Sequence, residues 1–329
     1  MRHSFVILPL ISTLFLTFAS CAEHFSTDNG EIWATTYHIV YSGNKNLHDS
    51  IRAQLEIIDD ELSMFNPKSK LTEINRGCDT TDSHFQTVFD CATAVSRISD
   101  GRYDPTVAPL VDVWGFGRTE AGAHPSDSVI ASCLASVGIA ECRIDNDILT
   151  RKSHDTEFDF SSLAKGYGVD CVADMFDRNN VKNYMIEVGG EIRVRGTNPR
   201  GKKWRIQIDE PTPGAMHSRY TVLELGPDPT GVATSGNYRN YRPDENGGFF
   251  GHTISPLDGR PIVTEVLSAT IVAPTCMFAD ALATACMTGT YAQAEDIINK
   301  SQTAALIIVG GHGSMTAKKI GCLPTTENP

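Results

Sequence analysis

The sequence has few basic residues for its length. Its 329 residues include 28 Lys and Arg against 40 Asp and Glu, which gives a formal charge of −12. Binding to nucleic-acid backbones requires clustered Lys and Arg, so nucleic acid is an unsuitable partner. Hydrophobic residues make up 41% and charged residues 21%, which is ordinary for a globular chain with a sizeable core. No internal repeat, low-complexity tract or convincing inter-domain linker is present.

Three common site motifs are also missing. No Cys-x-x-Cys pair occurs, so a zinc site is not expected. Ser161 and Ser162 do not lie in a Gly-x-Ser-x-Gly turn, which leaves serine hydrolysis without support. Residues 159–170 contain glycines but lack the spacing of a Walker loop or a dinucleotide fingerprint, so a Rossmann domain is disfavoured.

Cysteine is not scarce, and its positions indicate burial more than bonding. Of the nine cysteines, one lies at position 21 and is treated below. Four others lie on apolar helical faces and are predicted to be small buried side chains: Cys91, Cys171, Cys276 and Cys286. Cys133 and Cys142 could pair in an oxidising compartment, and the sequence does not decide whether they do.

The first twenty residues are predicted to lie outside the fold. A short basic start precedes an apolar run of 15 residues, 5–19, too short to span a membrane comfortably. The run ends Phe18-Ala-Ser-Cys21, which resembles a bacterial lipoprotein signal with Cys21 as the lipidated first residue. A Sec signal cleaved elsewhere is the alternative. Either way the body is exported, and with a lipid on Cys21 it is anchored to a membrane and faces the periplasm. We expect residues 21–31 to be a polar tether in front of a domain spanning 32–329.

The body alternates strand and helix patterns. Trp33–Tyr41 has the composition of a first strand, and apolar residues recur at helical steps over 47–62 and 85–98. Residues 101–117 carry too many Gly and Pro for a long regular element, yet are apolar enough to pack against the core or a flat ligand. The remaining strands are long and antiparallel in pattern, with interspersed helices, which predicts an α+β fold.

A strand-like run, 266–273, breaks at Pro274 and leads into a helix of small residues. Asp280 and Thr284 stand four apart on it and therefore lie on one helix face, one turn above the other. A carboxylate and a hydroxyl so placed are oxygen ligands for a hard cation such as Mg2+. Taken alone, the pair also fits a solvated face.

Residues 159–170 form a junction between a strand and a helix. Unpaired N–H groups and the positive end of a helix dipole favour phosphate at such a place. Lys165 would add a charge there, and Gly166 and Gly168 would allow close approach. The alternative is a helix start whose lysine reaches water. Further along, His252 lies in a turn where its imidazole could take a proton from a hydroxyl, or simply bond to the backbone.

Seven segments, in this order, resemble the ApbE family of FAD:protein FMN transferases, and they cover nearly all of the chain after the signal. They are Ala34-Thr-Thr-Tyr37, Ser63–Asn75, Tyr103–Leu110 with Trp114-Gly-Phe-Gly117, Asp159–Asp170, Glu187-Val-Gly-Gly190, His252-Thr-Ile-Ser-Pro256 and the helix with Asp280 and Thr284. The resemblance implies a single two-lobed domain, T-fold-like, with antiparallel sheets and packed helices.

The resemblance also implies roles for individual residues. Asp280 and Thr284 match the magnesium ligands, and a main-chain carbonyl of Ser162, or alternatively Ala164, matches the third. His252 matches the histidine needed for transfer. The positions that match FAD contacts are Trp33, Phe65, Val107, Ala108, Pro109, Asp159, Lys165 and, through its backbone, Ile254.

The activity implied is the Mg2+-dependent transfer of FMN from FAD to a Thr or Ser hydroxyl of an acceptor protein, with release of AMP. Family acceptors are exported or membrane-bound redox subunits of Rnf-type and sodium-pumping NADH:quinone oxidoreductase complexes. Two alternatives remain open at this point. One is a Mg2+-dependent FAD pyrophosphatase that yields FMN and AMP, and the other is a periplasmic flavin-binding lipoprotein without turnover.

Overall fold

The computed structural model describes residues 23–118, 124–212, 218–236, 241–243, 249–311 and 314–325. The predicted signal, 1–20, and the predicted lipidation site, Cys21, lie outside these residues. Among the described residues, no helix is both long and apolar enough to cross a membrane.

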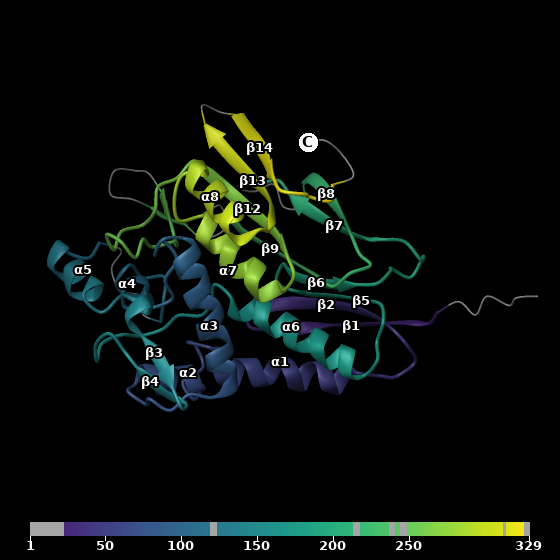
Figure 1. Cartoon of the computed structure of the whole chain (residues 1–329), viewed down its shortest axis with the longest axis horizontal. Helices are drawn as coiled ribbons and strands as arrows, with labels where there is room; N and C mark the ends of the chain where they lie inside the picture. The colour runs from purple at the N-terminus through teal and green to yellow at the C-terminus, as the bar shows by residue number, and fades with distance from the viewer. Residues whose placement is uncertain are drawn as a thin grey trace, which may run out of the picture.

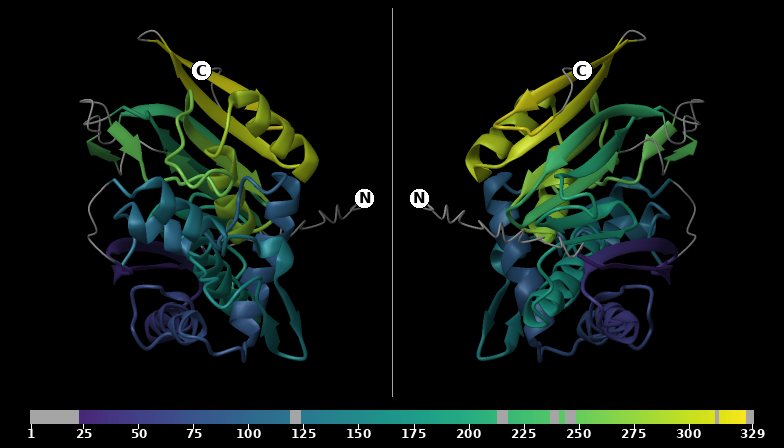
Figure 2. Two further views of the ribbon diagram at one scale, coloured as in Figure 1. Left: turned by 90° about the vertical axis from the view of Figure 1, so that its left-hand side faces the viewer. Right: turned by 90° about the vertical axis from the view of Figure 1, so that its right-hand side faces the viewer.

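One eight-stranded sheet forms the centre of the molecule, in the order β1-β2-β5-β6-β9-β12-β13-β14. Every neighbouring pair in it is antiparallel. Figure 1 and Figure 2 show the N-terminal strands at one end of the sheet and the C-terminal hairpin at the other. The strands are β1 (Phe25–Ile32), β2 (Thr35–Ser42), β5 (Tyr184–Val188), β6 (Glu191–Arg195), β9 (Thr230–Gly236), β12 (Val266–Ala273), β13 (Ala304–Gly311) and β14 (Ser314–Ile320).

Helices cover one face of the sheet and a small hairpin covers the other. On β13, Ala305 and Ile307 pack with the helices, whereas Leu306 packs with the hairpin. This alternation is the period of two expected for a strand with both faces buried. The main helices are α1 (His48–Leu62), α3 (Ser83–Ile98), α6 (Ala164–Arg178), α7 (Cys276–Cys286) and α8 (Tyr291–Ser301), and the hairpin is β7 (Trp204–Asp209) with β8 (Arg219–Leu225).

Shorter elements complete the body, and the predicted α+β class is confirmed. Residues 101–117 contain one short helix, in keeping with their Gly and Pro content. The remaining described elements are α2 (Lys70–Asn75), α4 (Ala108–Val113), α5 (Asp127–Leu134), η1 (Ile139–Glu141), β3 (Arg143–Asp145), β4 (Ile148–Thr150), β10 (Tyr241–Pro243) and β11 (Phe249–Gly251).

The predicted tether is wrong for most of its length. Residues 25–32 form β1, which pairs with β2 from Phe25↔Ser42 to Ile32↔Thr35. The turn between the strands is Trp33–Ala34, with φ angles of 51° and 56°, so Trp33 lies in a hairpin turn and not in a strand. β1 escaped prediction because it is an edge strand of mostly polar sequence, FSTDNGEI, without an apolar alternation.

The described cysteines are all free thiols. Cys171, Cys276 and Cys286 are buried as predicted, and Cys91 is half-buried against the core. Cys133 and Cys142 do not form the disulfide that the sequence left open. The buried thiols therefore serve as small core side chains.

Candidate functional site

The site is built where the first turn of α6 meets the first turns of α7. The backbone N of Gly166 donates a hydrogen bond to Asp280 Oδ2 at 3.1 Å. A Cβ at position 166 would lie 2.6 Å from the carbonyl oxygen of Cys276, so the two helices approach this closely only because Gly166 has no side chain. The junction thus fixes Asp280 against the start of α6.

A second carboxylate holds the same two helices together. Asp170, on α6, accepts hydrogen bonds from the backbone N of Cys276 at 2.9 Å and of Met277 at 2.8 Å, and so caps α7. Arg193 on β6 donates to Asp170 Oδ1 at 2.5 Å. The sequence placed Asp170 only at the end of a motif and missed this role. A carboxylate on the apolar side of a helix is the signal that could have indicated it.

Lys165 lies between two acidic side chains. Its Nζ is 2.8 Å from Glu191 Oε1 and 3.9 Å from Asp280 Oδ2. Burial raises the pKa of Asp280 to about 7, against the opposing effect of the Lys165 charge, while Glu191 raises it further. Burial alone lowers the pKa of Lys165, but Asp280 and Glu191 together bring it above its usual value. The lysine therefore stays charged in this acidic surrounding.

Glu191 is a site residue that the sequence missed. It is 5% exposed, and its Oε2 is buried without a hydrogen-bond partner in the described part of the chain. It begins β6 directly after the Gly189–Gly190 turn, and an acidic residue at the start of a buried strand is the signal that could have indicated it. An orphaned buried carboxylate oxygen beside a lysine is typical of a site that binds something more.

Asp280 and Thr284 lie one turn apart on α7, as the spacing predicted. Asp280 is 3% exposed, whereas Thr284 is half-buried with its Oγ1 3.2 Å from Ser235 Oγ on β9. Ser162, two residues ahead of α6, has its hydroxyl 2.9 Å from the hydroxyl of Tyr103. The side chain of Ser162 is thus engaged by Tyr103, which suits a role for its main chain.

These donors fit a hard divalent cation. No group of three or more His, Cys, Asp or Glu in the described ranges could hold a metal by itself. The set at the α6–α7 junction is instead mixed, with one buried carboxylate, one hydroxyl and the main chain before α6. Carboxylate, hydroxyl and carbonyl oxygens are ligands for Mg2+, and Asp280 receives a hydrogen bond on Oδ2 alone among its described contacts. Its other oxygen is left for a ligand.

Trp33 lies against α6 at Gly168. A Cβ at Gly168 would be 2.3 Å from the Trp33 ring, so the glycine makes room for the indole. Trp33 Nε1 is buried with no hydrogen-bond partner among the described residues. The β1–β2 turn therefore places an aromatic side chain against the first turns of α6, and its contact with a flavin stays a prediction.

A second group of predicted residues gathers around α4. The backbone N of Asp159 donates to Pro105 O at 2.7 Å, and Val107 forms a β-bridge with Glu157. Burial raises the pKa of Asp159, while the backbone N of Ser161 donates to its side chain at 2.8 Å. Ala108 is fully buried at the start of α4, and Pro109 is half-buried. The Asp159 segment therefore links this group to Lys165.

The loop with His252 packs on the same helix. Ile254 is 5% exposed and joins a cluster with Leu110 and Trp114, whose Nε1 donates to Gly259 O at 2.8 Å. The His252 imidazole is exposed, with its ring 6.3 Å from that of Phe116. The histidine is thus open to a macromolecule approaching from solvent.

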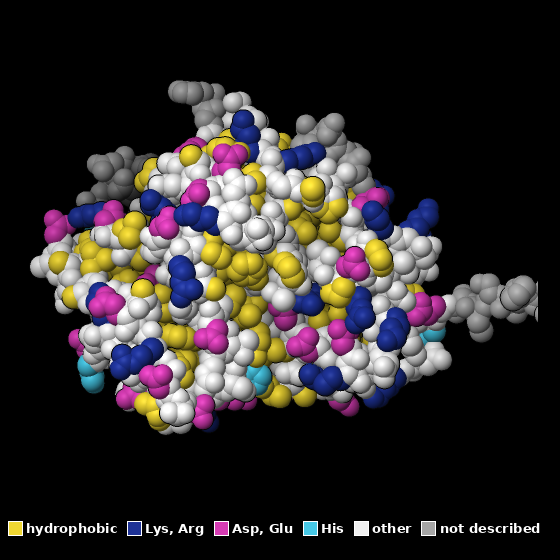
Figure 3. All heavy atoms as spheres, in the orientation of Figure 1, with side chains coloured by type: hydrophobic (Ala, Val, Ile, Leu, Met, Phe, Trp, Pro, Cys, Tyr) yellow, Lys and Arg dark blue, Asp and Glu magenta, His cyan; other side chains and the backbone are white. Residues whose placement is uncertain are grey.

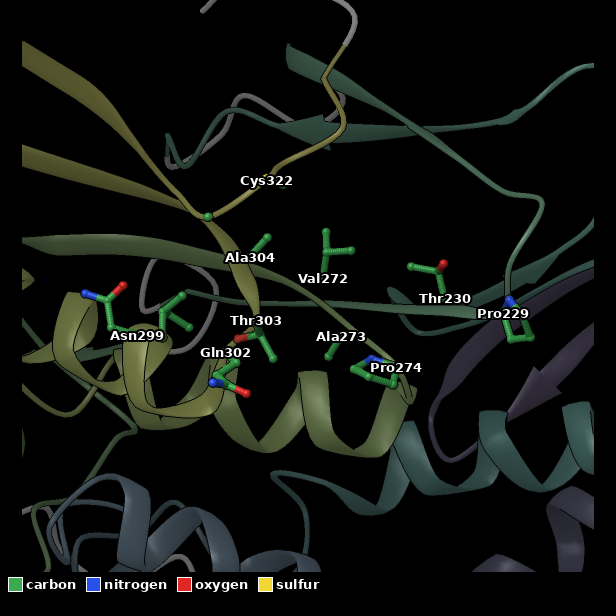
Figure 4. A pocket seen from close by; sticks show the side chains of 12 residues that line it. Pro229, Thr230, Val272, Ala273, Pro274, Asn299, Gln302, Thr303, Ala304 and Cys322 are labelled. Atoms are coloured by element: carbon green, nitrogen blue, oxygen red, sulfur yellow. The ribbon is translucent and has the colours of Figure 1, made fainter.

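Phe65 is not brought into either group. Its side chain is 65% exposed in the loop before α2, and it belongs to none of the buried clusters. A hollow of about 630 Å³ also lies away from the predicted residues, beside the start of β13 and the end of α8 (Figure 4). None of the predicted site residues lines it.

Comparison with known proteins agrees with the sequence resemblance. The model of the ApbE family matches residues 33–308. The FAD:protein FMN transferase of Vibrio cholerae serotype O1 is 34% identical over 292 residues, covering 85% of this chain and 86% of the relative. The protein of the same name from Haemophilus influenzae is 32% identical, with 89% and 90% covered. The solved structure of the flavin transferase ApbE from Vibrio cholerae superposes with a TM-score of 0.80 at 31% identity, over 91% of this chain and 97% of the other.

Proposed function

Because the chain belongs to the ApbE family, we propose that it transfers FMN from FAD to a Thr or Ser hydroxyl of an acceptor protein and releases AMP. The observation that carries the proposal is the α6–α7 junction, where a buried carboxylate, a hydroxyl and a charged lysine meet at the start of a 15-residue helix. That set of groups suits a pyrophosphate with its cation.

The metal would be held by Asp280, Thr284 and a main-chain carbonyl at Ser162 or Ala164. When bound, Mg2+ supplies charge neutralisation for the two phosphates. Lys165 and the N-terminal turn of α6 would hold the phosphate oxygens from the protein side. Glu191 and Asp280 keep the lysine ammonium at this point, and so orient the pyrophosphate.

The flavin half of FAD would extend from this junction toward Trp33 and the α4 segment. Trp33 offers an aromatic surface, and Val107, Ala108 and Pro109 offer an apolar one, with the Ile254 backbone nearby. Asp159 lies between these residues and Lys165 in the chain. Phe65 contacts none of these residues in a buried cluster. Its exposed ring would contact the flavin only once FAD is bound.

In the transfer step, the acceptor hydroxyl oxygen attacks the FMN-side phosphorus of FAD. The bond from that phosphorus to the bridging oxygen breaks, and AMP leaves with that oxygen. The hydroxyl proton passes to His252, whose exposed imidazole suits a macromolecular acceptor. Positioning and neutralisation of charge supply most of the rate.

Acceptors and location follow from the same proposal. The lipoprotein-like signal ending in Cys21 supports an exported enzyme anchored at a membrane and facing the periplasm. Acceptors on that side would be flavin-carrying redox subunits of the Rnf or sodium-pumping NADH:quinone oxidoreductase type.

The test is incubation of the purified protein with FAD, Mg2+ and a candidate acceptor subunit. A covalently yellow acceptor together with AMP is expected, and Asp280→Ala should abolish both. Free FMN and AMP formed at the same rate without acceptor would instead establish an FAD pyrophosphatase. If FAD stays intact, or if Asp280→Ala cleaves FAD as wild type does, both enzyme functions are refuted and a flavin-binding lipoprotein is the remaining candidate.

A further inference from the structure

The basic residues of this acidic chain are unevenly placed. Residues 193–205 contain six Lys and Arg and no Asp or Glu. Two of the six, on β6, form ion pairs with carboxylates of α6. The other four are exposed and are called here the basic face: Arg200, Lys202, Lys203 and Arg205.

The loop that carries the basic face has a fixed shape. The side-chain oxygen of Asn198 accepts hydrogen bonds from the backbone N of Arg200 at 2.9 Å and of Lys202 at 3.2 Å. Its amide nitrogen donates to Lys203 O at 2.8 Å. Asn198 therefore holds the turn from inside, while the charged side chains point outward.

A hollow of about 290 Å³ lies among these side chains. It is lined by Asn198, the four residues of the basic face and Glu224. Arg205 is 3.7 Å from Glu224, whereas the other three cations form no ion pair within the part of the chain that the structure describes. The hollow is therefore suited to a phosphate-bearing headgroup.

The folded body begins beside this loop. The carboxylate of Glu23 accepts a hydrogen bond from Asn183 Nδ2 at 2.7 Å, and Asn183 Oδ1 accepts one from Thr197 N at 2.8 Å. Only Ala22 separates Glu23 from Cys21. Two extended residues reach about 7 Å, so a lipid on Cys21 would bring this side of the molecule to the bilayer.

We propose that the basic face lies against anionic phospholipid headgroups when the protein is anchored through Cys21. The proposal rests on the lipid anchor of the proposed function and adds the orientation that the charges of the headgroups give to the anchored body. Clustered Lys and Arg next to a membrane attachment point are attracted to anionic lipid. Lys182 is also exposed, with its carbonyl oxygen against Gly196 of the preceding turn. Figure 3 shows Lys and Arg together with Asp and Glu side chains near the edge where β1 begins.

Few acidic groups oppose this attraction. Glu23 accepts a hydrogen bond from Asn183 and keeps its charge, whereas Glu224 faces Arg205. Asp228 is exposed in the turn before β9, whose Pro227 carbonyl accepts from Gly196 N at 2.8 Å. The unmatched cations Arg200, Lys202 and Lys203 therefore leave the face positive while the whole chain is strongly acidic.

The orientation is tested by amine labelling of the purified, lipidated protein on vesicles. A water-soluble acetylating reagent is applied on phosphatidylcholine/phosphatidylglycerol vesicles and on neutral phosphatidylcholine vesicles, neither of which contains a lipid amine, with mass-spectrometric readout. Labelling of Lys202 and Lys203 should fall several-fold on the anionic vesicles, while Lys68, in the loop before α2, keeps its labelling. Equal labelling of Lys202 and Lys203 on both vesicles would overturn the proposal.

A variant pair tests the charges. Arg200→Gln/Lys202→Gln/Lys203→Gln should lower binding to the anionic vesicles, measured on the protein after removal of its acyl chains. About fivefold per cation gives a loss on the order of 100-fold. The matched control Arg97→Gln/Arg143→Gln/Lys318→Gln removes three exposed charges elsewhere and should bind as wild type. Identical losses in both variants would reduce the effect to net charge and refute a specific face.

The outcomes separate this proposal from the one on which it rests. FMN transfer in detergent should be unchanged in both triple variants, because neither alters the α6–α7 junction. Mass spectrometry that finds Cys21 without lipid would refute the anchor, while vesicle co-sedimentation still decides on the basic face. Loss of transfer to a protein acceptor in the basic-face variant, with no protection on vesicles, would assign the face to the acceptor and overturn the membrane proposal.

Discussion

Lys165 lies between two buried carboxylates with different surroundings. Asp280 also accepts from Gly166 N and lies one turn from Thr284, so its position is fixed by α6 and α7. Glu191 has one oxygen on the lysine and one with no described partner. Leaving a buried oxygen unpaired costs about 1–3 kcal/mol. We therefore interpret Glu191 as a positioning residue that holds the ammonium of Lys165.

Replacing Glu191 tests that interpretation. Glu191→Gln keeps the shape and removes the charge, so Lys165 should be held less firmly and kcat/KM for FAD should fall about tenfold. The measurement is steady-state FMN transfer, compared with Lys165→Ala and with the double variant. Since Glu191 acts through Lys165, the two losses should not add, and strictly additive losses would contradict the assignment.

At the scale of elements, the site depends on how α6 and α7 are joined. Gly166 permits their close approach, Asp170 caps α7, and Arg193 on β6 is paired with Asp170. The proposed metal ligands Asp280 and Thr284 are on α7, while the turn proposed to bind phosphate is on α6. The proposed transfer therefore requires that this junction be rigid.

Asp170→Ala should destabilise the protein markedly. The change leaves the buried N–H of Cys276, the partly buried N–H of Met277 and the Arg193 guanidinium without their partner, at about 1–3 kcal/mol for each lost backbone bond. Chemical denaturation gives the free energy of unfolding. Asp177→Ala is the control on the same helix, because the half-exposed Asp177–Arg195 pair is worth at most about 1 kcal/mol. Equal losses in the two variants would contradict a capping role.

A pH effect is expected where α1 meets α3. Glu61, in the last turn of α1, faces Asp82, the N-cap of α3, and their hydrogen bond, with burial, raises the pKa of Glu61 to about 7. Folding thus favours the protonated form. The contribution of Glu61 to the free energy of unfolding is complete below its usual pKa of about 4.5, and it is lost as the pH rises through 7. Lys70 offsets part of this effect.

Glu61→Gln should therefore raise Tm at about pH 8 and leave it nearly unchanged at about pH 4. Differential scanning calorimetry of wild type and variant at the two pH values measures the change in Tm. Glu56→Gln on the same helix removes the exposed pair with Arg52 and should show no such difference. A rise at pH 4 as large as that at pH 8 would rule out titration of Glu61 as the cause.

The sequence predicted local relations well and distant ones poorly. The Asp280–Thr284 pair and the Lys165 helix start were found because helical spacing is a property of a few consecutive residues. Glu191 was missed because its partner lies 26 residues away, and Asp170 because the groups that it caps are over 100 residues further on. Such pairings depend on how distant parts of the chain pack against the sheet, and no pattern of consecutive residues predicts them.

For the whole molecule, the two faces of the sheet differ in what covers them. The helical face carries the α6–α7 junction, whereas the opposite face is closed by the β7–β8 hairpin through Trp204, Ile206 and Leu223. This arrangement follows the fold of the solved ApbE structure over 91% of the chain. The residues proposed for the metal and the phosphates thus lie on the helical side, and the basic loop lies at the base of the hairpin that closes the other side.

Ligands that bind the helical face should stabilise the whole body. Mg2+ and FAD together at about 100 times their Kd would add about 3 kcal/mol to the free energy of unfolding, seen as a rise in Tm by scanning fluorimetry. Chelation with EDTA should remove most of the rise. Asp280→Asn should lose the Mg2+-dependent part alone, and a full Mg2+ effect in that variant would place the metal elsewhere.

β1 has a consequence for how far the enzyme can act. Because the chain enters the sheet at Phe25, an anchor at Cys21 would have almost no slack and would keep the body at the bilayer surface, and the basic face would hold it there in one orientation. The height of the α6–α7 junction over the lipid would then be set by the rigid protein and not by a flexible chain. Acceptor hydroxyls at that height above the bilayer would be modified, whereas hydroxyls closer to the bilayer or further from it would not.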